Sequence, residues 1–455
     1  MLPLVKAGGR MNRVYFLHAL GASAREWDQV IADLGDVGAC VPLCLPGFGG
    51  SPDADLDVAG LVDWFSEQVA AHQPQSWAVV GHSMGGKIAT LAAARARDGD
   101  PAFAGLAAVV LLAASPPASE PMAEERRAEM IDWFANGRIG PDEAATFVDA
   151  NTAQRLPEPL RTQAIADVER SRRLAWTGWL KRDSREDWRE AAGTLAVPAL
   201  IVAGGEDGDL GEDAQRRLNL PHYRNARVEV VAGAAHLLPY EQPAAVATLI
   251  RDHITQAFAR ALPAPFVALL ASDRVSRGTR AVMTERHAAP PRGKVLSPQQ
   301  RAVLAALIET VLPGAADPVD LAARIDAMLT SGIGDGWRSA ELPADAEGWT
   351  SGLDTLDHLS SSFADASPAD REQCLQSIAD ETADTEGGAF DPRQMRLWFA
   401  EARSEIARQW MALPATMARI GYDGFAVGGD GPHKQGYRLT AADMIEDWQQ
   451  LEVQA

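Results

Sequence analysis

The sequence predicts a mostly parallel, doubly wound α/β sheet in the first part of the chain and an all-α domain in the second. Three observations predict this. Short apolar runs recur through residues 14–231, with helical patterns between them. A glycine-flanked serine joins one of these runs to a helix. Beyond residue 296 the apolar positions recur at helical spacing only. Apolar runs that alternate with helices favour parallel strands covered on both faces.

Six short apolar runs are the strand candidates. Only about a dozen residues precede the first of them, so we expect a shortened sheet of about six strands. Helical patterns such as Val58–Ala71 lie between the runs and would cover the sheet. The candidates are Val14–Leu17, Ala39–Leu43, Trp77–Val80, Ala107–Leu112, Ala199–Ala203 and Arg227–Val231.

The third run leads directly into the segment Gly81-His82-Ser83-Met84-Gly85, and a helical pattern, Gly86–Ala92, follows. Glycines beside the serine tolerate a strained backbone and leave room at a sharp turn. The turn would expose the Ser83 hydroxyl at the edge of the sheet, with the start of a helix beneath it to favour negative charge. This pattern predicts a nucleophile for acyl transfer.

A serine nucleophile needs a base, and the base needs a carboxylate that orients it. Asp207 follows the fifth strand candidate, and His236 follows the sixth. Both would therefore lie at the same sheet edge as Ser83, in the order Ser, Asp, His. Asp209 is the alternative carboxylate, two residues further on; the spacing of Asp207 from Gly204 favours Asp207.

Residues 1–258 resemble the α/β-hydrolase superfamily. The resemblance implies that Ser83 is the nucleophile, His236 the general base and acid, and Asp207 the orienting carboxylate. It also implies an oxyanion hole formed by the backbone N–H groups of Leu20 and Met84. Besides the serine turn and the Asp207 loop, it is carried by Leu17-His18-Ala19-Leu20-Gly21, Leu45-Pro46-Gly47-Phe48-Gly49-Gly50-Ser51 and His236-Leu237-Leu238-Pro239-Tyr240-Glu241.

Between about residues 115 and 196 the strand rhythm stops, and relatives carry a lid at this place. We expect helices at Met122–Ala135, Pro141–Asn151 and Pro159–Lys181. A lid shapes the pocket and excludes water. Trp176 and Trp179 would either line that pocket or form the core of the lid. His18 and His82 flank the site as possible neighbours, and for both a packing role is the more common alternative.

After a partly helical linker, residues 259–295, we expect a domain of five or six helices over residues 296–455. Three helix starts combine Ser or Asp with Pro at the first helical position. They are Ser297-Pro298-Gln299-Gln300, Ser367-Pro368-Ala369-Asp370 and Asp391-Pro392-Arg393-Gln394.

This domain is similar to the gluconate 2-dehydrogenase subunit 3 family over about residues 296–440. The likeness is carried by the segments 296–300, 311–314, 420–425 and 428–431. It implies an accessory role beside a flavin-dependent sugar or alcohol dehydrogenase.

The net charge of −20 argues against a nucleic-acid partner, and no apolar run is long enough for a membrane helix. Three cysteines show neither a disulfide framework nor zinc spacing. We expect a cytoplasmic enzyme without metal or cofactor: a serine hydrolase of a small ester, thioester or lactone. The alternative is an accessory subunit that docks a flavoprotein dehydrogenase through the helical domain.

Overall fold

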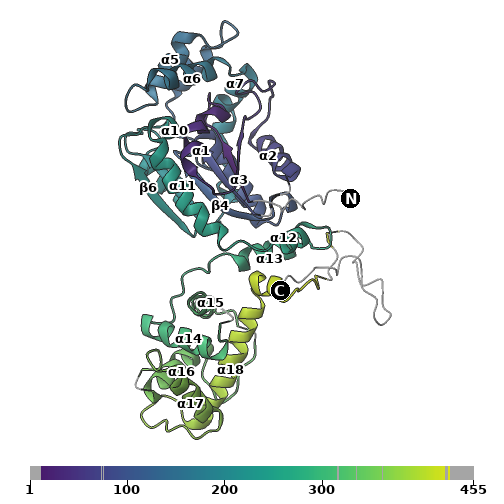
Figure 1. Ribbon diagram of the computed structural model, residues 1–455, viewed down its shortest axis with the longest axis vertical. Helices are drawn as coiled ribbons and strands as arrows, with labels where there is room; N and C mark the ends of the chain where they lie inside the picture. Colours follow the sequence, from purple (N-terminus) through teal and green to yellow (C-terminus); the bar gives the residue numbers. More distant parts are fainter. Residues whose placement is uncertain are drawn as a thin grey trace, which may run out of the picture. The chain divides into compact units, whose positions relative to one another are not determined.

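The computed structural model describes residues 12–72, 74, 76–314, 317–334, 336–360, 362–425 and 429–430 (Figure 1). The contacts divide these residues into two units. The first comprises the described residues up to Ala288 together with those from Asp423 onward, and the second is Ala289–Tyr422. Residues 431–455, which we assigned to the helical domain, lie outside the described residues.

A six-stranded parallel sheet forms the centre of the first unit, in the order β2-β1-β3-β4-β5-β6. The predicted doubly wound parallel sheet is therefore confirmed, and each strand begins and ends within two residues of its predicted bounds. The strands are β1 (Arg13–Leu17), β2 (Ala39–Leu43), β3 (Trp77–His82), β4 (Leu106–Leu112), β5 (Ala199–Gly204) and β6 (Ala226–Val231).

Alternate residues of each strand enter two separate cores, because successive side chains point to opposite faces. Phe16 and Val80 pack with helices α1 (Asp28–Leu34) and α11 (Pro243–Phe258). Leu17 and Val79 pack on the other face with α2 (Val58–His72) and α3 (Met84–Arg97). The shorter helices of the unit are η1 (Ala24–Trp27), η2 (Pro101–Phe103), η3 (Asp183–Arg185), α8 (Arg189–Ala192), α9 (Glu212–Leu218), η4 (Leu220–His222) and α10 (Leu238–Glu241).

Besides the short η3 and α8, the predicted lid segment contains four helices where we expected three. They are α4 (Glu124–Asp132), α5 (Pro141–Ala150), α6 (Glu158–Glu169) and α7 (Arg173–Lys181). The expected helix Pro159–Lys181 is interrupted because Arg172 is extended (φ −92°, ψ 146°). Its N–H donates to the Gly47 carbonyl at 2.8 Å instead of to a carbonyl of its own helix. A tertiary contact has thus overridden the local helical pattern.

The segment that we predicted as a partly helical linker contains two helices, α12 (Ala264–Ala271) and α13 (Arg277–His287), and both belong to the first unit. The buried Arg280 guanidinium on α13 donates from Nε to the Gly99 carbonyl at 2.7 Å. On α12, Phe266 and its apolar neighbours are buried. The predicted end of the first domain, at residue 258, therefore differs from the division that the contacts give.

The second unit is a helical domain, as predicted. Its six helices within the described residues are α14 (Pro298–Val311), α15 (Pro318–Ser331), α16 (Asp345–Leu359), α17 (Pro368–Ala379), α18 (Pro392–Met411) and α19 (Pro414–Arg419). Two of the three predicted starts are full capping boxes, Ser297 with Gln300 and Asp391 with Gln394. At the third, the Ser367 side chain accepts from the Asp370 N–H. No helix among the described residues is long and apolar enough to cross a bilayer.

Candidate active site

Ser83 follows β3 directly and has a strained backbone, with φ 50° and ψ −116°. Such positive φ angles are costly for residues other than glycine, and they are found where surrounding structure enforces them. Here the flanking glycines make the turn possible. A Cβ on Gly81 would lie 2.4 Å from the Gly85 carbonyl oxygen, and one on Gly85 would lie 2.4 Å from the Leu17 carbonyl oxygen. The turn places Ser83 at the start of α3.

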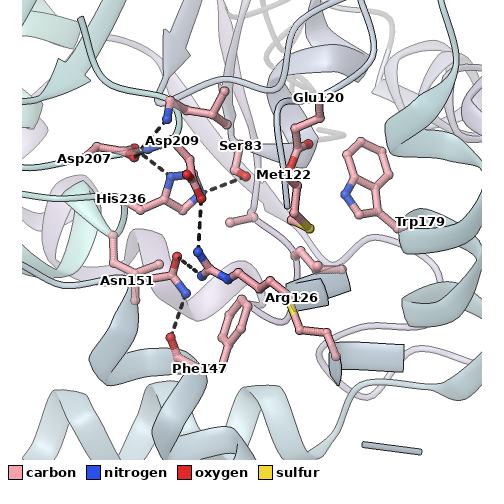
Figure 2. A pocket seen from close by; sticks show the side chains of 15 residues that line it. Ser83, Glu120, Met122, Arg126, Phe147, Asn151, Trp179, Asp207, Asp209 and His236 are labelled. Carbon is pink, nitrogen blue, oxygen red and sulfur yellow. Dashed lines mark hydrogen bonds and ion pairs between the residues drawn. The ribbon is translucent and has the colours of Figure 1, made fainter. Parts of the chain in front are cut away.

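The side chains of Ser83, His236 and Asp207 form one hydrogen-bonded series (Figure 2). His236 Nε2 lies 2.9 Å from Ser83 Oγ, and His236 Nδ1 lies 2.8 Å from Asp207 Oδ2. The three residues follow β3, β5 and β6, which are parallel and therefore end at the same edge of the sheet. Three residues far apart in the sequence are thus brought together as their positions after the strands predicted.

The electrostatics of this series stabilise a charged carboxylate beside the imidazole. Burial would raise the pKa of Asp207, but the hydrogen bond and charge of His236, with two backbone N–H groups, hold that pKa below its usual value. Burial would conversely lower the pKa of His236, and the hydrogen bond and charge of Asp207 outweigh it, so that the pKa is raised. Asp207 Oδ1 accepts the N–H groups of Asp209 and Leu210, each at 3.0 Å.

Asp209, the alternative carboxylate, has a different partner. Its Oδ2 lies 3.0 Å from Nη1 of Arg126 in an ion pair that is largely exposed. Its own backbone N–H helps to hold Asp207. The geometry therefore favours Asp207 over Asp209 as the partner of His236.

The two backbone N–H groups expected to form the oxyanion hole are those of Leu20 and Met84. Within the described part of the chain neither donates to a protein acceptor. The Met84 N–H belongs to the first residue of α3, where helix N–H groups favour negative charge. Buried His18 does not reach the series; its Nδ1 donates to the Ala19 carbonyl at 2.8 Å, and its Nε2 accepts the Leu45 N–H at 3.0 Å. His18 therefore supports the Leu20 loop.

A cavity of about 50 Å³ opens onto Ser83 and His236 beneath the predicted lid. Trp179 lines it, whereas Trp176 belongs to the core of the lid. The Trp176 indole Nε1 donates to the Met130 carbonyl at 2.9 Å, and its ring packs against Trp133 and Phe147. The side chains that line the cavity from the lid segment are Glu120, Met122, Arg126, Met130, Phe147, Asn151 and Trp179 (Figure 2).

Comparison with known proteins gives the family. A family model described as alpha/beta hydrolase family matches residues 14–249, more than half of the chain. The chain belongs to the alpha/beta hydrolase family. A second model, gluconate 2-dehydrogenase subunit 3, matches residues 298–429, so that an alpha/beta hydrolase is fused to a domain of that second kind, as predicted.

Several curated proteins are similar to the hydrolase part. A biotin biosynthesis bifunctional protein BioHC of Teredinibacter turnerae is 27% identical over 53% of this chain, which spans only 44% of that protein. The esterase Rv0045c of Mycobacterium tuberculosis is 27% identical over 54% of this chain and 83% of its own length. A pimeloyl-[acyl-carrier protein] methyl ester esterase of Neisseria meningitidis is 26% identical over 54% of this chain and 94% of its own length.

Among solved structures, an esterase from Exiguobacterium antarcticum covers 54% of this chain and 92% of its own. The sequence identity is 16% and the TM-score is 0.47.

A buried polar pair of the hydrolase was not foreseen from the sequence. His82 Nε2 donates to the His236 carbonyl at 2.7 Å, and His82 Nδ1 lies 3.3 Å from both carboxylate oxygens of Glu26. Glu26 Oε1 also accepts the Ala19 N–H at 3.3 Å. His82 thus contacts both the backbone of His236 and its imidazole, with ring centroids 5.4 Å apart. Glu26 lies in an ordinary helix-start pattern behind Ser23, which gave no signal of this role.

The hydrolase also ties the lid segment to the loop of His236 through residues that sequence reasoning missed. The Asn151 carbonyl accepts the N–H groups of both His236 and Leu237, each at 3.1 Å. Glu241 accepts the Ala235 N–H at 2.9 Å and the Ala153 N–H at 2.6 Å. The only available signal for Asn151 was its place at the end of a predicted helix, where an Asn commonly terminates the helix.

Proposed function

We propose that this hydrolase cleaves a small ester, thioester or lactone through an acyl-enzyme on Ser83. The observation that carries the proposal is the series from Asp207 through His236 to Ser83, with contacts of 2.8 and 2.9 Å. A hydroxyl is a weak nucleophile unless a base takes its proton, and the base works best when a third group fixes its tautomer. Asp207 would accept a hydrogen bond from Nδ1–H, which leaves Nε2 free to accept the proton of Ser83.

In the first half of the reaction, Ser83 Oγ attacks the carbonyl carbon while its proton passes to His236 Nε2. The negative charge that develops on the carbonyl oxygen would be stabilised by the N–H groups of Leu20 and Met84, which have no other acceptor in the described chain. His236 then gives the proton to the leaving alcohol, thiol or ring oxygen. The acyl group remains bonded to Ser83.

In the second half, water replaces the leaving group and His236 takes its proton, so that hydroxide character develops as the water attacks the acyl carbon. Return of the proton to Ser83 releases the acid. The names of the relatives support ester chemistry, since the similarity to the Rv0045c esterase and the methyl ester esterase extends over most of their length. A cavity of about 50 Å³ favours a small group beside Ser83.

A fluorophosphonate probe tests the proposal without knowledge of the substrate, because it labels a serine activated beside an oxyanion hole. Peptide mass spectrometry of the full-length protein should locate the adduct on Ser83. The His236→Ala variant should not be labelled. A folded wild-type protein that takes no label at Ser83 would contradict the proposal.

A second candidate function rests on the match of residues 298–429 to the gluconate 2-dehydrogenase subunit 3 model. In this alternative the helical domain docks a flavin-dependent sugar or alcohol dehydrogenase, and the hydrolase is ancillary. The redox reaction would then take place in the flavoprotein partner. Affinity purification of the tagged full chain from its own organism should then recover a flavoprotein, identified by its flavin absorbance. Recovery should be lost when residues 289–422 are deleted.

A further inference from the structure

The pocket beside Ser83 contains a carboxylate for which the proposed mechanism has no use. Glu120 precedes α4, lines the pocket and is only 9% exposed. Its backbone is fixed by a hydrogen bond from its N–H to the Ser184 carbonyl at 2.7 Å. Oε2 is buried, and no hydrogen-bond donor in the described chain reaches it. Figure 2 shows the side chain directed into the pocket, toward Met122.

Lys87 and Arg127 interact electrostatically with this carboxylate, but neither donates a hydrogen bond to Oε2. Arg127 Nη1 donates to the Leu180 carbonyl at 2.9 Å. Lys87 Nζ donates to the carbonyls of Asp183 and Glu186, both at 3.2 Å. Arg126, on the pocket wall, pairs with Asp209 and donates to Asn151. Within the described chain, the hydrogen-bonding capacity of Oε2 therefore remains unused.

A buried acceptor without a donor is costly. An apolar ester would leave Oε2 unpaired in the filled pocket. A substrate that supplies a donor at this position would pair it. Pockets that hold such an acceptor discriminate strongly against analogues that lack the matching donor.

We infer that Glu120 accepts a hydrogen bond from a hydroxyl group of the substrate, so that the preferred substrates are hydroxylated esters or lactones. This inference rests on the proposed hydrolysis at Ser83. A hydroxyl group supplies the donor without bringing a further charge that would have to lose its hydration in the pocket.

The test compares matched esters that differ by their hydroxyl groups. Methyl β-hydroxybutanoate is set against methyl butanoate for a hydroxyl in the acyl part, and glycerol monobutanoate against propyl butanoate for the alcohol part. With the full-length protein, kcat/KM for the hydroxylated ester of at least one pair should exceed that of its partner by about 10-fold or more. Release of acid is followed by titration.

Two variants assign the preference to the carboxylate. Glu120→Leu should abolish or reverse the preference, and Glu120→Gln should reduce it while keeping the size of the side chain. The matched control is Glu125→Gln, which removes one charge from an exposed position of the same segment and should keep the wild-type preference. The rate of fluorophosphonate labelling shows that Ser83 remains functional in each variant.

Hydrolysis of both pairs without discrimination, or an unchanged preference in Glu120→Leu, would overturn the inference and leave the proposed function standing. Absence of both hydrolysis and labelling would remove the proposed function, and the inference with it. A preference that depends on Glu120 would support both.

Discussion

The His82 imidazole is hydrogen-bonded to the backbone of His236, with Nε2 2.7 Å from the His236 carbonyl oxygen. His82, which precedes Ser83 in the sequence, thereby holds the loop of His236. Glu26 contacts the other nitrogen of His82 and also the Ala19 N–H next to the expected oxyanion hole. One buried carboxylate therefore connects two loops on which the proposed reaction depends.

Glu26→Ala should both destabilise the protein and lower kcat, since it leaves the Ala19 N–H and His82 Nδ1 without their partner. We expect a loss of about 1–3 kcal/mol in the free energy of unfolding. Urea denaturation and steady-state kinetics measure the two effects. Glu67→Ala, at an exposed position of α2, is the control. Unchanged stability and kcat would show that Glu26 supports neither loop.

Ser83→Ala should abolish ester hydrolysis and leave the protein folded. Ser83→Gly should be equally inactive but more stable than Ser83→Ala by about 1 kcal/mol, because glycine adopts a φ of +50° without the steric cost that alanine has. Circular dichroism during thermal unfolding compares the variants. Residual hydrolysis in both would exclude Ser83 as the nucleophile.

Asp207→Asn should lower kcat by up to about 10⁴-fold, because an amide no longer selects the tautomer of His236 that can accept a proton from Ser83. Asp209→Asn should have a much smaller effect, exerted through its ion pair with Arg126. Kinetics of the two variants on the same ester decide between the carboxylates. A larger loss in Asp209→Asn would reverse our assignment.

The acid limb of kcat/KM should lie above about pH 6.5, the ordinary pKa of histidine, because Asp207 raises the pKa of His236 and the base must be neutral to act. In Asp207→Asn the limb should move to lower pH. The same raised pKa favours the protonated native state. Its contribution to stability is therefore full below about pH 6.5 and is lost as the pH rises through the native pKa. If the pH–rate profile does not move in Asp207→Asn, Asp207 is not the cause of the raised pKa of His236.

A fragment of residues 1–288 should fold and retain ester hydrolysis, because α12, α13 and every proposed catalytic residue belong to the first unit. It lacks the residues from Asp423 onward, which also belong to that unit and include Phe425, a ring contact of Phe266. A fragment of residues 1–258 should be less stable, since it also removes Arg280 and its hydrogen bond to Gly99. Thermal unfolding of the two fragments tests the boundary. If the fragment of residues 1–288 were insoluble while that of residues 1–258 was stable, the domain boundary at residue 288 would be wrong.

Much of the fold could be predicted because its signals are local. The strands are continuous apolar runs, and the turn at Ser83 needs glycines at fixed positions. The break in the lid helix at Arg172 depends instead on the distant Gly47 carbonyl. Likewise, α13 was predicted as part of a partly helical linker, because the acceptor for Arg280 lies far away in the sequence.

The same distinction holds for the candidate site. Ser83, Asp207 and His236 each follow a predicted parallel strand. Because such strands end at one edge of the sheet, the sequence was enough to predict that the three residues lie close together. The roles of Glu26, Glu120 and Asn151 depend on contacts across loops, and their neighbours in the sequence carry no trace of those contacts.

The carbonyl of Asn151 accepts the backbone N–H groups of His236 and Leu237, so that the end of α5 and the loop of the proposed base form one hydrogen-bonded piece. A displacement of α5 that widens the entrance must either break these two bonds or carry the imidazole with it. Entry of substrate and readiness for proton transfer would then alternate in time.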